Sequence, residues 1–324
     1  MSNPIFQFST AKRQKSKASI IIEGLSGRGK SGLALVLATA LSSAPDKVFA
    51  LDTENCSLNL CDGLPSTSGG KFGGFQTFNF TPEIGFKPSN YIAAREAAIE
   101  AGAETLVQDS ITHAWAYKGG ILDMISELKN SNTRYQRDSY AAWGDDTIVK
   151  EKNMLNQMLR DSRVHVISTV RVKERLEYDR DDNGKSTLTS LGDQQIMQAD
   201  IKYEPDLVLQ MIEPGCVSSK GIKYPKAKVS KSRYAIFEVG ETYEFTPQLC
   251  EQLKQYLEEG ADPAALLEAQ RQDYIVGIKA YLDSHKNAVP LWNQLKADAG
   301  YKDKKLGEIP LPELKDIFIK LTID

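Results

Sequence analysis

The eight residues from Gly24 to Ser31 constrain the fold more than any other part of this sequence. They read GLSGRGKS and match the pattern G-x-x-x-x-G-K-[S/T] in full, which happens by chance in about one chain in a hundred of this length. The motif lies between a β-branched run, residues 18–23, and an Ala/Leu-rich run, residues 30–43, and therefore between a predicted strand and a predicted helix. Glycines there allow backbone N–H groups to surround an anion at the start of the helix. The sequence therefore predicts a site for the phosphates of a nucleotide.

The residue types of this loop suggest individual roles. Lys30 is expected to reach the β- and γ-phosphates, and the Ser31 hydroxyl is expected to bind Mg²⁺. ATP and Mg²⁺ are therefore the expected cofactors. The other residues expected to contact the nucleotide are Gly24, Ser26, Gly27, Arg28, Gly29 and Gly32. Arg28 stands where a small residue is more usual. The sequence allows two partners for it, a phosphate or a neighbouring molecule.

Short β-rich runs alternate with longer helical runs along the chain. Strands are expected at 18–23, 47–52, 104–109, 164–170 and 206–212, and β-rich runs follow at 222–229 and 234–239. Helices are expected at 30–43, 88–101 and 247–260, together with a mostly helical stretch up to about residue 161, and a surface loop is expected at 63–74. Alternation of this kind predicts an α/β fold with a mostly parallel central sheet flanked by helices.

The chain is expected to have four parts. Residues 1–17 form a basic arm, 18–245 the P-loop core, 246–261 a connecting helix and 262–324 a small helical domain. The last part is expected because apolar residues recur there at helical spacing.

Composition excludes several classes of protein. A hydrophobic content of 41% and a net charge of −3 are close to those of ordinary globular proteins. No apolar run approaches the ~18 residues of a membrane span, so no membrane partner is expected. The N-terminus lacks the apolar core of a secretory signal. The four cysteines show no metal-ligand spacing, so free thiols and a cytoplasmic location are expected.

Acidic residues follow two of the predicted strands. Asp109 closes the strand 104–109 and is expected to hold Mg²⁺ opposite Ser31. Glu54 follows the strand 47–52, where a group that activates water would lie near the γ-phosphate. On residue types alone, Asp52 and Glu54 could equally be acids that cap a turn.

The segments GLSGRGKS, LDTEN, LVQDSIT, ISTVRVK and KVSKSRYAIF together resemble RecA-type ATPases over about residues 18–245. The nearest likeness is to compact phage-encoded RecA-like ATPases of single-strand annealing and recombination. The resemblance implies a RecA-like core in which Glu54 activates the attacking water and Thr169 senses the γ-phosphate, where RecA itself has glutamine. Lys231 and Arg233 match the cationic fingers that reach a neighbouring subunit's nucleotide. A basic edge strand is the alternative.

The resemblance also implies a DNA-binding loop after the strand 164–170. Here that segment reads as a hairpin around Asn183-Gly184, since Asn-Gly favours tight turns. Its cationic residues are Lys173, Arg175, Arg180 and Lys185. Five acidic residues are interleaved with them, so a merely solvated hairpin stays open. Phe8 and Ala11 form the Phe-x-x-Ala pattern with which some recombinases join a neighbouring subunit, and an ordinary arm is the alternative.

The resemblance therefore implies a Mg²⁺-dependent, DNA-stimulated ATPase that acts on single-stranded DNA in phage recombination, annealing or replication. Such a protein would assemble with copies of itself as a ring or filament. The alternative is a nucleotide-gated loader whose C-terminal domain docks a single-strand-binding, replication or recombination protein. A P-loop kinase for a small molecule is a third reading, in which Glu54, Lys231 and Arg233 have no role.

Overall fold

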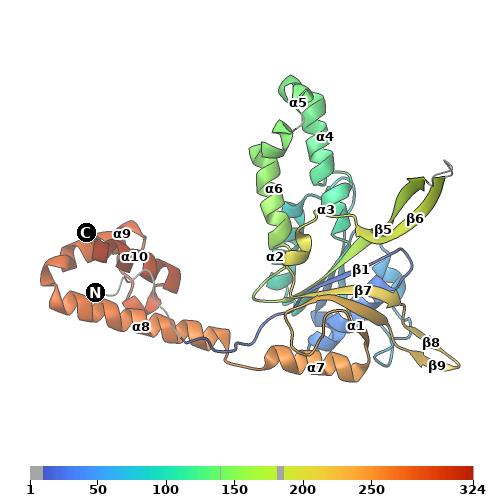
Figure 1. The fold of residues 1–324 in the computed structure, drawn as a ribbon. Helices are drawn as coiled ribbons and strands as arrows, with labels where there is room; N and C mark the ends of the chain where they lie inside the picture. The colour runs from blue at the N-terminus through green and yellow to red at the C-terminus, as the bar shows by residue number, and fades with distance from the viewer. Residues whose placement is uncertain (1–9, 139, 181–185, 324) are drawn as a thin grey trace. The chain divides into compact units, whose positions relative to one another are not determined.

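The computed structural model describes residues 10–138, 140–180 and 186–323. The chain forms two compact units (Figure 1). The first unit is Lys17–Leu257. The second joins the described residues up to Ser16 to residues 258–323. The four-part division expected from the sequence stays a prediction.

A mostly parallel sheet forms the centre of the first unit. Its strands are β1 (Ser19–Gly24), β2 (Val48–Asp52), β3 (Gln76–Asn79), β4 (Thr105–Asp109), β5 (His165–Arg180), β6 (Ser186–Gln195), β7 (Leu207–Glu213), β10 (Lys226–Ser232) and β11 (Thr242–Glu244). The order is β11-β10-β7-β1-β5-β4-β2-β3, and β6 pairs with β5 outside this order. Strands β6, β10 and β11 are antiparallel to the strands beside them, and the other pairs are parallel. Strand β5 therefore separates β1 from β4. This confirms the expected α/β class.

The central strands are apolar throughout because both faces of the sheet are covered. In β1, Ile20 and Ile22 belong to one buried cluster and Ile21 to the other, as the alternation of strand side chains requires. Helix α1 (Lys30–Leu41) and helix α7 (Pro247–Glu258) contribute to the first cluster. Helix α2 (Pro88–Glu100) contributes to the second.

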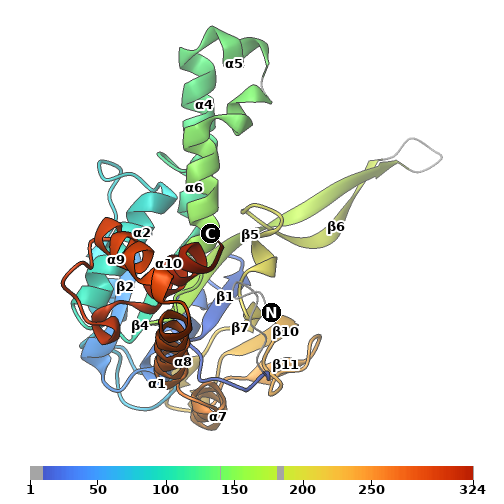
Figure 2. The ribbon, with the colours of Figure 1, turned by 90° about the vertical axis from the view of Figure 1, so that its left-hand side faces the viewer.

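A helical arm connects β4 to β5. It contains α3 (Thr112–Ala116), α4 (Ile121–Ser131), α5 (Thr133–Arg137) and α6 (Asp146–Gln157), and Figures 1 and 2 show α4, α5 and the start of α6 projecting beyond the sheet. A second projection is the antiparallel hairpin of β5 and β6. The Asn183-Gly184 turn of this expected hairpin lies outside the described residues.

Short elements complete the first unit. Strands β8 (Cys216–Ser218) and β9 (Gly221–Lys223) form a separate ribbon. The 3₁₀ helices are η1 (Pro45–Lys47), η2 (Leu58–Cys61), η3 (Ala141–Gly144) and η4 (Ile201–Tyr203).

The second unit has its own apolar core. Helices α8 (Pro263–Ser284), α9 (Val289–Asp298) and α10 (Leu311–Ile323), with η5 (Lys286–Ala288) and η6 (Leu306–Glu308), build it. Ile278, Trp292 and Leu314 are among its buried residues. The N-terminal segment joins this unit through a bridge between Gln14 and Ala261. No helix in the described part of the chain is both long and apolar enough to cross a membrane.

One expectation about strands was wrong, and one strand was missed. Residues 234–239 form turns and bends, and Tyr234 and Phe237 are buried there as separate anchors in the first cluster. The strand in this region is instead the mostly polar β11. The edge strand β3 was missed because most of its residues are exposed. The expectation of free cysteines is confirmed for all four.

Candidate functional site

The GLSGRGKS segment forms a tight loop between the end of β1 and the start of α1. Gly27 and Gly29 have φ angles of 74° and 84°, in the left-handed region that favours glycine. A Cβ atom on Gly29 would lie 2.8 Å from the Pro214 Cβ atom, so the loop also has no space for a side chain there. The first turn of α1 contains no acidic residue, and its N-cap makes no side-chain hydrogen bond. The helix therefore presents free N–H groups to an anion.

Lys30 is buried at the start of α1, and its Nζ donates a hydrogen bond to the Leu25 carbonyl oxygen at 3.0 Å. Burial lowers the pKa of Lys30, although the charges of Glu54 and Asp109 oppose this shift. A buried ammonium group that is held by a neutral carbonyl is available to an incoming phosphate. This fits the role expected for Lys30.

Asp109 lies at the end of β4 and is 1% exposed. Its Oδ2 accepts a hydrogen bond from Ser31 Oγ at 2.5 Å, and its Oδ1 accepts one from Thr169 Oγ1. Because β5 lies beside β4, Thr169 reaches a strand that is far from it in sequence. Burial raises the pKa of Asp109, and the two hydroxyl hydrogen bonds only partly oppose that shift.

These oxygen atoms suit Mg²⁺, which binds hard oxygen ligands and keeps several of its waters. The Ser31 hydroxyl and one Asp109 carboxylate oxygen are already adjacent. Within the described residues no group of three or more His, Cys, Asp or Glu side chains could hold a metal ion. The donor set therefore fits an ion that is shared with phosphate oxygens and not a resident all-protein metal site.

The structure separates the tasks of the two acids that follow β2. Asp52 is fully buried, and its carboxylate accepts hydrogen bonds from the backbone N–H groups of Glu54 and Leu58, both at 2.7 Å. Asp52 is therefore the acid that holds the turn. The Glu54 carboxylate instead accepts a hydrogen bond from Arg171 Nε at 2.8 Å. Burial raises the pKa of Glu54, but the hydrogen bond and charge of Arg171, together with the charges of His113 and Lys30, outweigh burial, so the pKa lies below its usual value.

Three further residues lie at this edge. The RecA-type resemblance puts Arg171 in a matching position after Thr169, and Thr53 and His113 were not assigned from the sequence. Arg171 lies two positions after Thr169 on β5, so strand alternation could have indicated that both face the site. Thr53 Oγ1 accepts a hydrogen bond from the Ser110 N–H at 2.8 Å and lies 2.5 Å from His113 Nδ1. Burial lowers the pKa of His113 to about 4, so this ring is neutral at physiological pH. No pattern in the sequence identifies Thr53 or His113.

Comparison with known proteins agrees with this geometry. A sequence profile of a protein family, described as an AAA domain, matches residues 16–244. The chain belongs to this AAA-domain family. A comparison with curated proteins gives no match. The family supports nucleotide binding and ATPase activity for the domain, as the loop, the sheet and the acids led us to expect.

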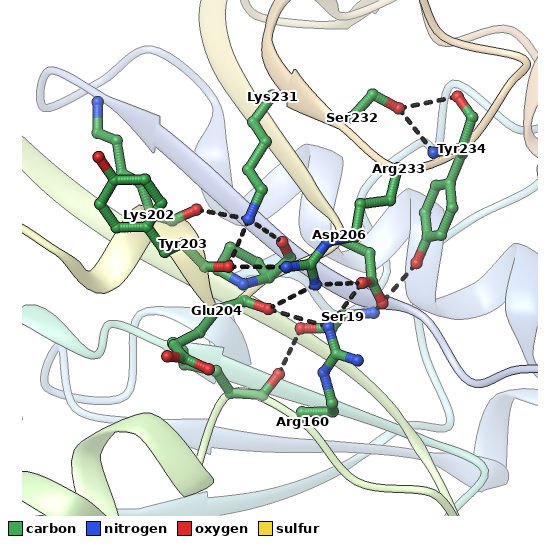
Figure 3. Close-up of polar contacts among 12 residues, drawn as sticks. Ser19, Arg160, Lys202, Tyr203, Glu204, Asp206, Lys231, Ser232, Arg233 and Tyr234 are labelled. Atoms are coloured by element: carbon green, nitrogen blue, oxygen red, sulfur yellow. Dashed lines mark hydrogen bonds and ion pairs between the residues drawn. The ribbon is translucent and has the colours of Figure 1, made fainter.

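Two cations of the AAA domain, Lys231 and Arg233, make polar contacts with the segment that contains Tyr203 and Asp206 (Figure 3). They belong to β10 and its end, where Ser232 pairs with Leu207 and Leu207 pairs with Ile20 near the start of β1. The P-loop lies at the opposite end of β1. In the described part of the chain, the hydrogen bonds and ion pair of these two cations are made with residues 202–206, and none of them involves the P-loop, Asp109 or Glu54.

Lys231 is held tightly within its own chain. Its Nζ donates to the carbonyl oxygens of Lys202, Tyr203 and Pro205 at 2.9, 2.6 and 2.7 Å. Arg233 and Arg160 both donate to Asp206 Oδ1, at 3.0 and 2.6 Å. Both arginine side chains are about half exposed. Arg233 also donates to the carbonyl oxygens of Tyr203 and Glu204, at 3.1 and 3.4 Å. The expected role of Lys231 and Arg233 as fingers stays a prediction, and only the greater exposure of Arg233 favours it over Lys231.

The other residues expected at the nucleotide site or on DNA make few contacts that bear on their roles. Arg28 is exposed, and its Nη1 donates to the Ile212 carbonyl oxygen at 3.3 Å. Gly24, Ser26 and Gly32 occupy the expected loop and first helical turn. Lys173 is exposed at the base of the hairpin. Arg175 and Arg180 lie on β5, and Lys185 and Phe8 are outside the described residues.

Proposed function

We propose that this AAA-domain protein hydrolyses ATP with Mg²⁺ and couples that reaction to single-stranded DNA in recombination, annealing or replication. The observation that supports this most is the convergence of Ser31, Asp109 and Thr169 beside Glu54 at the carboxyl edge of the sheet. Ligands of open α/β sheets bind at this edge. ATP therefore binds where Lys30 and the helix N-terminus face its phosphates.

The chemistry follows from the positions of these side chains. Mg²⁺, held by Ser31 and Asp109, would neutralise charge on the phosphates. Lys30 would leave the Leu25 carbonyl and bind a phosphate oxygen. Glu54 accepts the proton of the attacking water, and its low pKa keeps it ionised for that task.

The link to DNA rests on the continuity of β5. This strand carries Thr169 and Arg171 at the nucleotide site and then runs on into the hairpin with β6. A movement of Thr169 or Arg171 at the nucleotide site can therefore pass along one strand to the hairpin. The hairpin is the segment expected to contact DNA. Phage origin is part of the same proposal and depends on the RecA-like resemblance.

Self-assembly is supported by an apolar groove at the edge of the sheet. The groove has a volume of about 510 Å³ and lies between β3 and α2. Its apolar side chains include Phe49, Phe78, Phe80, Ile84, Ala93 and Ala97. The edge strand β3 and this groove offer a place for the Phe-x-x-Ala segment of a neighbouring copy, and Arg233 would approach that neighbour's nucleotide.

The decisive test uses Lys30→Ala, with Lys150→Ala on the exposed face of α6 as the matched control. We expect Lys30→Ala to lose ATP binding and ATP-dependent binding of single-stranded DNA, measured by fluorescence anisotropy. The control should match the wild type. Wild-type protein whose ATP hydrolysis and oligomeric state are both unchanged by single-stranded DNA would contradict the DNA-directed function.

A second candidate is a nucleotide-gated loader. The separate core of the second unit supports it, because a helical unit of this kind can bind a partner independently of the nucleotide site. Deletion of residues 262–324 distinguishes the two functions. A loader loses its replication or recombination partner and keeps DNA-stimulated hydrolysis.

A further inference from the structure

A buried carboxylate lies directly before the P-loop and has no part in the chemistry above. Glu23 precedes Gly24 in β1 and is 4% exposed. Its backbone lies between Val170 of β5 and Gln210 of β7. Removing a carboxylate from water is costly unless hydrogen bonds and an opposite charge compensate it. The partners of Glu23 therefore decide what it does.

Three side chains from three other elements meet this carboxylate. Its Oε2 accepts a hydrogen bond from Gln195 Nε2 at the end of β6 and lies 3.3 Å from Lys202 Nζ of η4. Its Oε1 accepts a hydrogen bond from Ser230 Oγ of β10 at 3.4 Å. An apolar side chain could fill the same space without the cost of desolvation. The carboxylate instead selects one arrangement of β1, β6, η4 and β10.

Gln195 connects this cluster to the base of the hairpin. It pairs with Val172 of β5, and the next residue, Ile196, donates its N–H to the Arg171 carbonyl oxygen at 2.9 Å. Both strands of the hairpin are therefore tied to the nucleotide site. Strand β5 is tied through Arg171 to Glu54, and β6 is tied through Gln195 to the residue before the P-loop.

We propose that Glu23 is a positioning residue that couples the P-loop to the β5–β6 hairpin through its hydrogen bond with Gln195. Phosphate binding fixes the backbone that follows Gly24. Gly24 has little freedom of its own, because it is the last residue of β1 and its backbone pairs with Arg171 of β5. Glu23 is then the first side chain before the loop that can pass a change to another element. This proposal rests on the proposed function, in which the hairpin holds DNA.

The test removes the contact on the hairpin side. Gln195→Ala leaves Glu23 with Lys202 and Ser230, and Gln194→Ala, an exposed neighbour on the same strand, is the matched control. Hydrogen exchange is followed at the amides of Val172 and Ile196 in the full-length protein, with and without Mg²⁺ and adenylyl imidodiphosphate. In the wild type and the control, we expect the analogue to slow exchange there at least about fivefold, the lower end of allosteric coupling.

In Gln195→Ala the analogue should bind with wild-type affinity while the slowing is lost. Glu23→Gln, which has nearly the same shape but no charge, should weaken the slowing in the same direction. The coupling is overturned if Gln195→Ala keeps the full slowing, if the wild type shows none, or if the variant simply loses ATP affinity. Protection in the wild type without any binding of single-stranded DNA would contradict the proposed function and leave the coupling intact.

Discussion

At the scale of single residues, Asp52 and Glu54 are two positions apart and have different tasks. We expect Glu54→Gln to slow phosphate release by about 100-fold or more, the range for loss of a general base. ATP affinity and stability should stay near wild type, because Glu54 holds no backbone group. Phosphate release and equilibrium binding of an ATP analogue measure this. Wild-type turnover in Glu54→Gln would show that another group activates water.

The matched substitution at Asp52 should behave in the opposite way. Asp52→Asn leaves without an acceptor either the buried N–H group of Leu58 or the half-buried N–H group of Glu54. The free energy of unfolding should fall by about 1–3 kcal/mol, the usual cost of such a group. Urea unfolding measures the loss. An unchanged urea midpoint would mean that Asp52 does not hold the turn.

We expect the buried carboxylate of Asp109 to lower the stability of the nucleotide-free protein although the nucleotide site needs it. Burial raises its pKa in the folded protein, so its contribution to stability is present at low pH and is lost as the pH rises through the folded pKa. Once the pH exceeds that folded pKa, the nucleotide-free protein carries an unfavourable buried charge. We expect Asp109→Asn to melt at a higher temperature than wild type near neutral pH, with a smaller difference at acidic pH. Calorimetry measures both.

The same variant should not be stabilised by Mg²⁺ with ATP, whereas the wild type should be, since ligand binding to the native state raises its stability. Two results would contradict this account. One is a lower melting temperature for nucleotide-free Asp109→Asn near neutral pH. The other is equal stabilisation of both proteins by Mg²⁺ and ATP.

The sequence predicts a part of the site well when the residues that form it are close together in the chain. The P-loop could be predicted because Gly24 to Ser31 carry its chemistry within one contiguous segment. The contact of Thr169 with Asp109, and of Arg171 with Glu54, depends on the order of strands in the sheet, which no local pattern encodes. Asp52 and Glu54 have the same residue character, and only their hydrogen-bond partners distinguish them.

At the scale of elements, burial decided which strands could be predicted. Strand β1 is covered on both faces and shows a continuous β-branched run. Strand β3 is at the sheet edge and mostly exposed, so its sequence shows no such run. Residues 234–239 have the composition of a strand because Tyr234 and Phe237 are core anchors, although the backbone there turns. The composition of residues 234–239 therefore indicated correctly that side chains there are buried, but it did not indicate that the backbone turns.

Strand β5 places Arg171 beside Glu54, and this contact should make ATP hydrolysis depend on pH. Arg171 lowers the pKa of Glu54, and burial raises it. Arg171→Ala removes the largest influences that oppose burial and leaves the smaller ones of His113 and Lys30, so the pKa of Glu54 should rise and the base should be protonated over a wider pH range. We expect the acidic limb of the ATPase pH profile to move to higher pH. Arg171→Lys, which keeps the positive charge, should restore part of the shift. An unchanged acidic limb in Arg171→Ala would contradict the role of Arg171.

At the scale of the whole molecule, the chain has two separate sets of buried residues. The clusters around the sheet draw on residues 18–257, and the third cluster draws on residues 275–321. Each unit therefore has the apolar core that independent folding requires. The sequence predicted the helical C-terminal part from its periodicity, but it could not show which core the helix α7 completes.

The place of α7 leads to a test with two truncations. Leu253 and Leu257 of α7 are buried in the cluster that covers one face of the sheet. Removing a buried leucine costs about 2–5 kcal/mol, and a domain is stable by only about 5–15 kcal/mol. We expect residues 17–257 alone to fold and to hydrolyse ATP, and residues 17–245 to be unfolded or insoluble. Circular dichroism and phosphate release measure both. A folded, active 17–245 fragment would show that α7 only connects the two units. A folded but inactive 17–257 fragment would mean that the second unit takes part in hydrolysis.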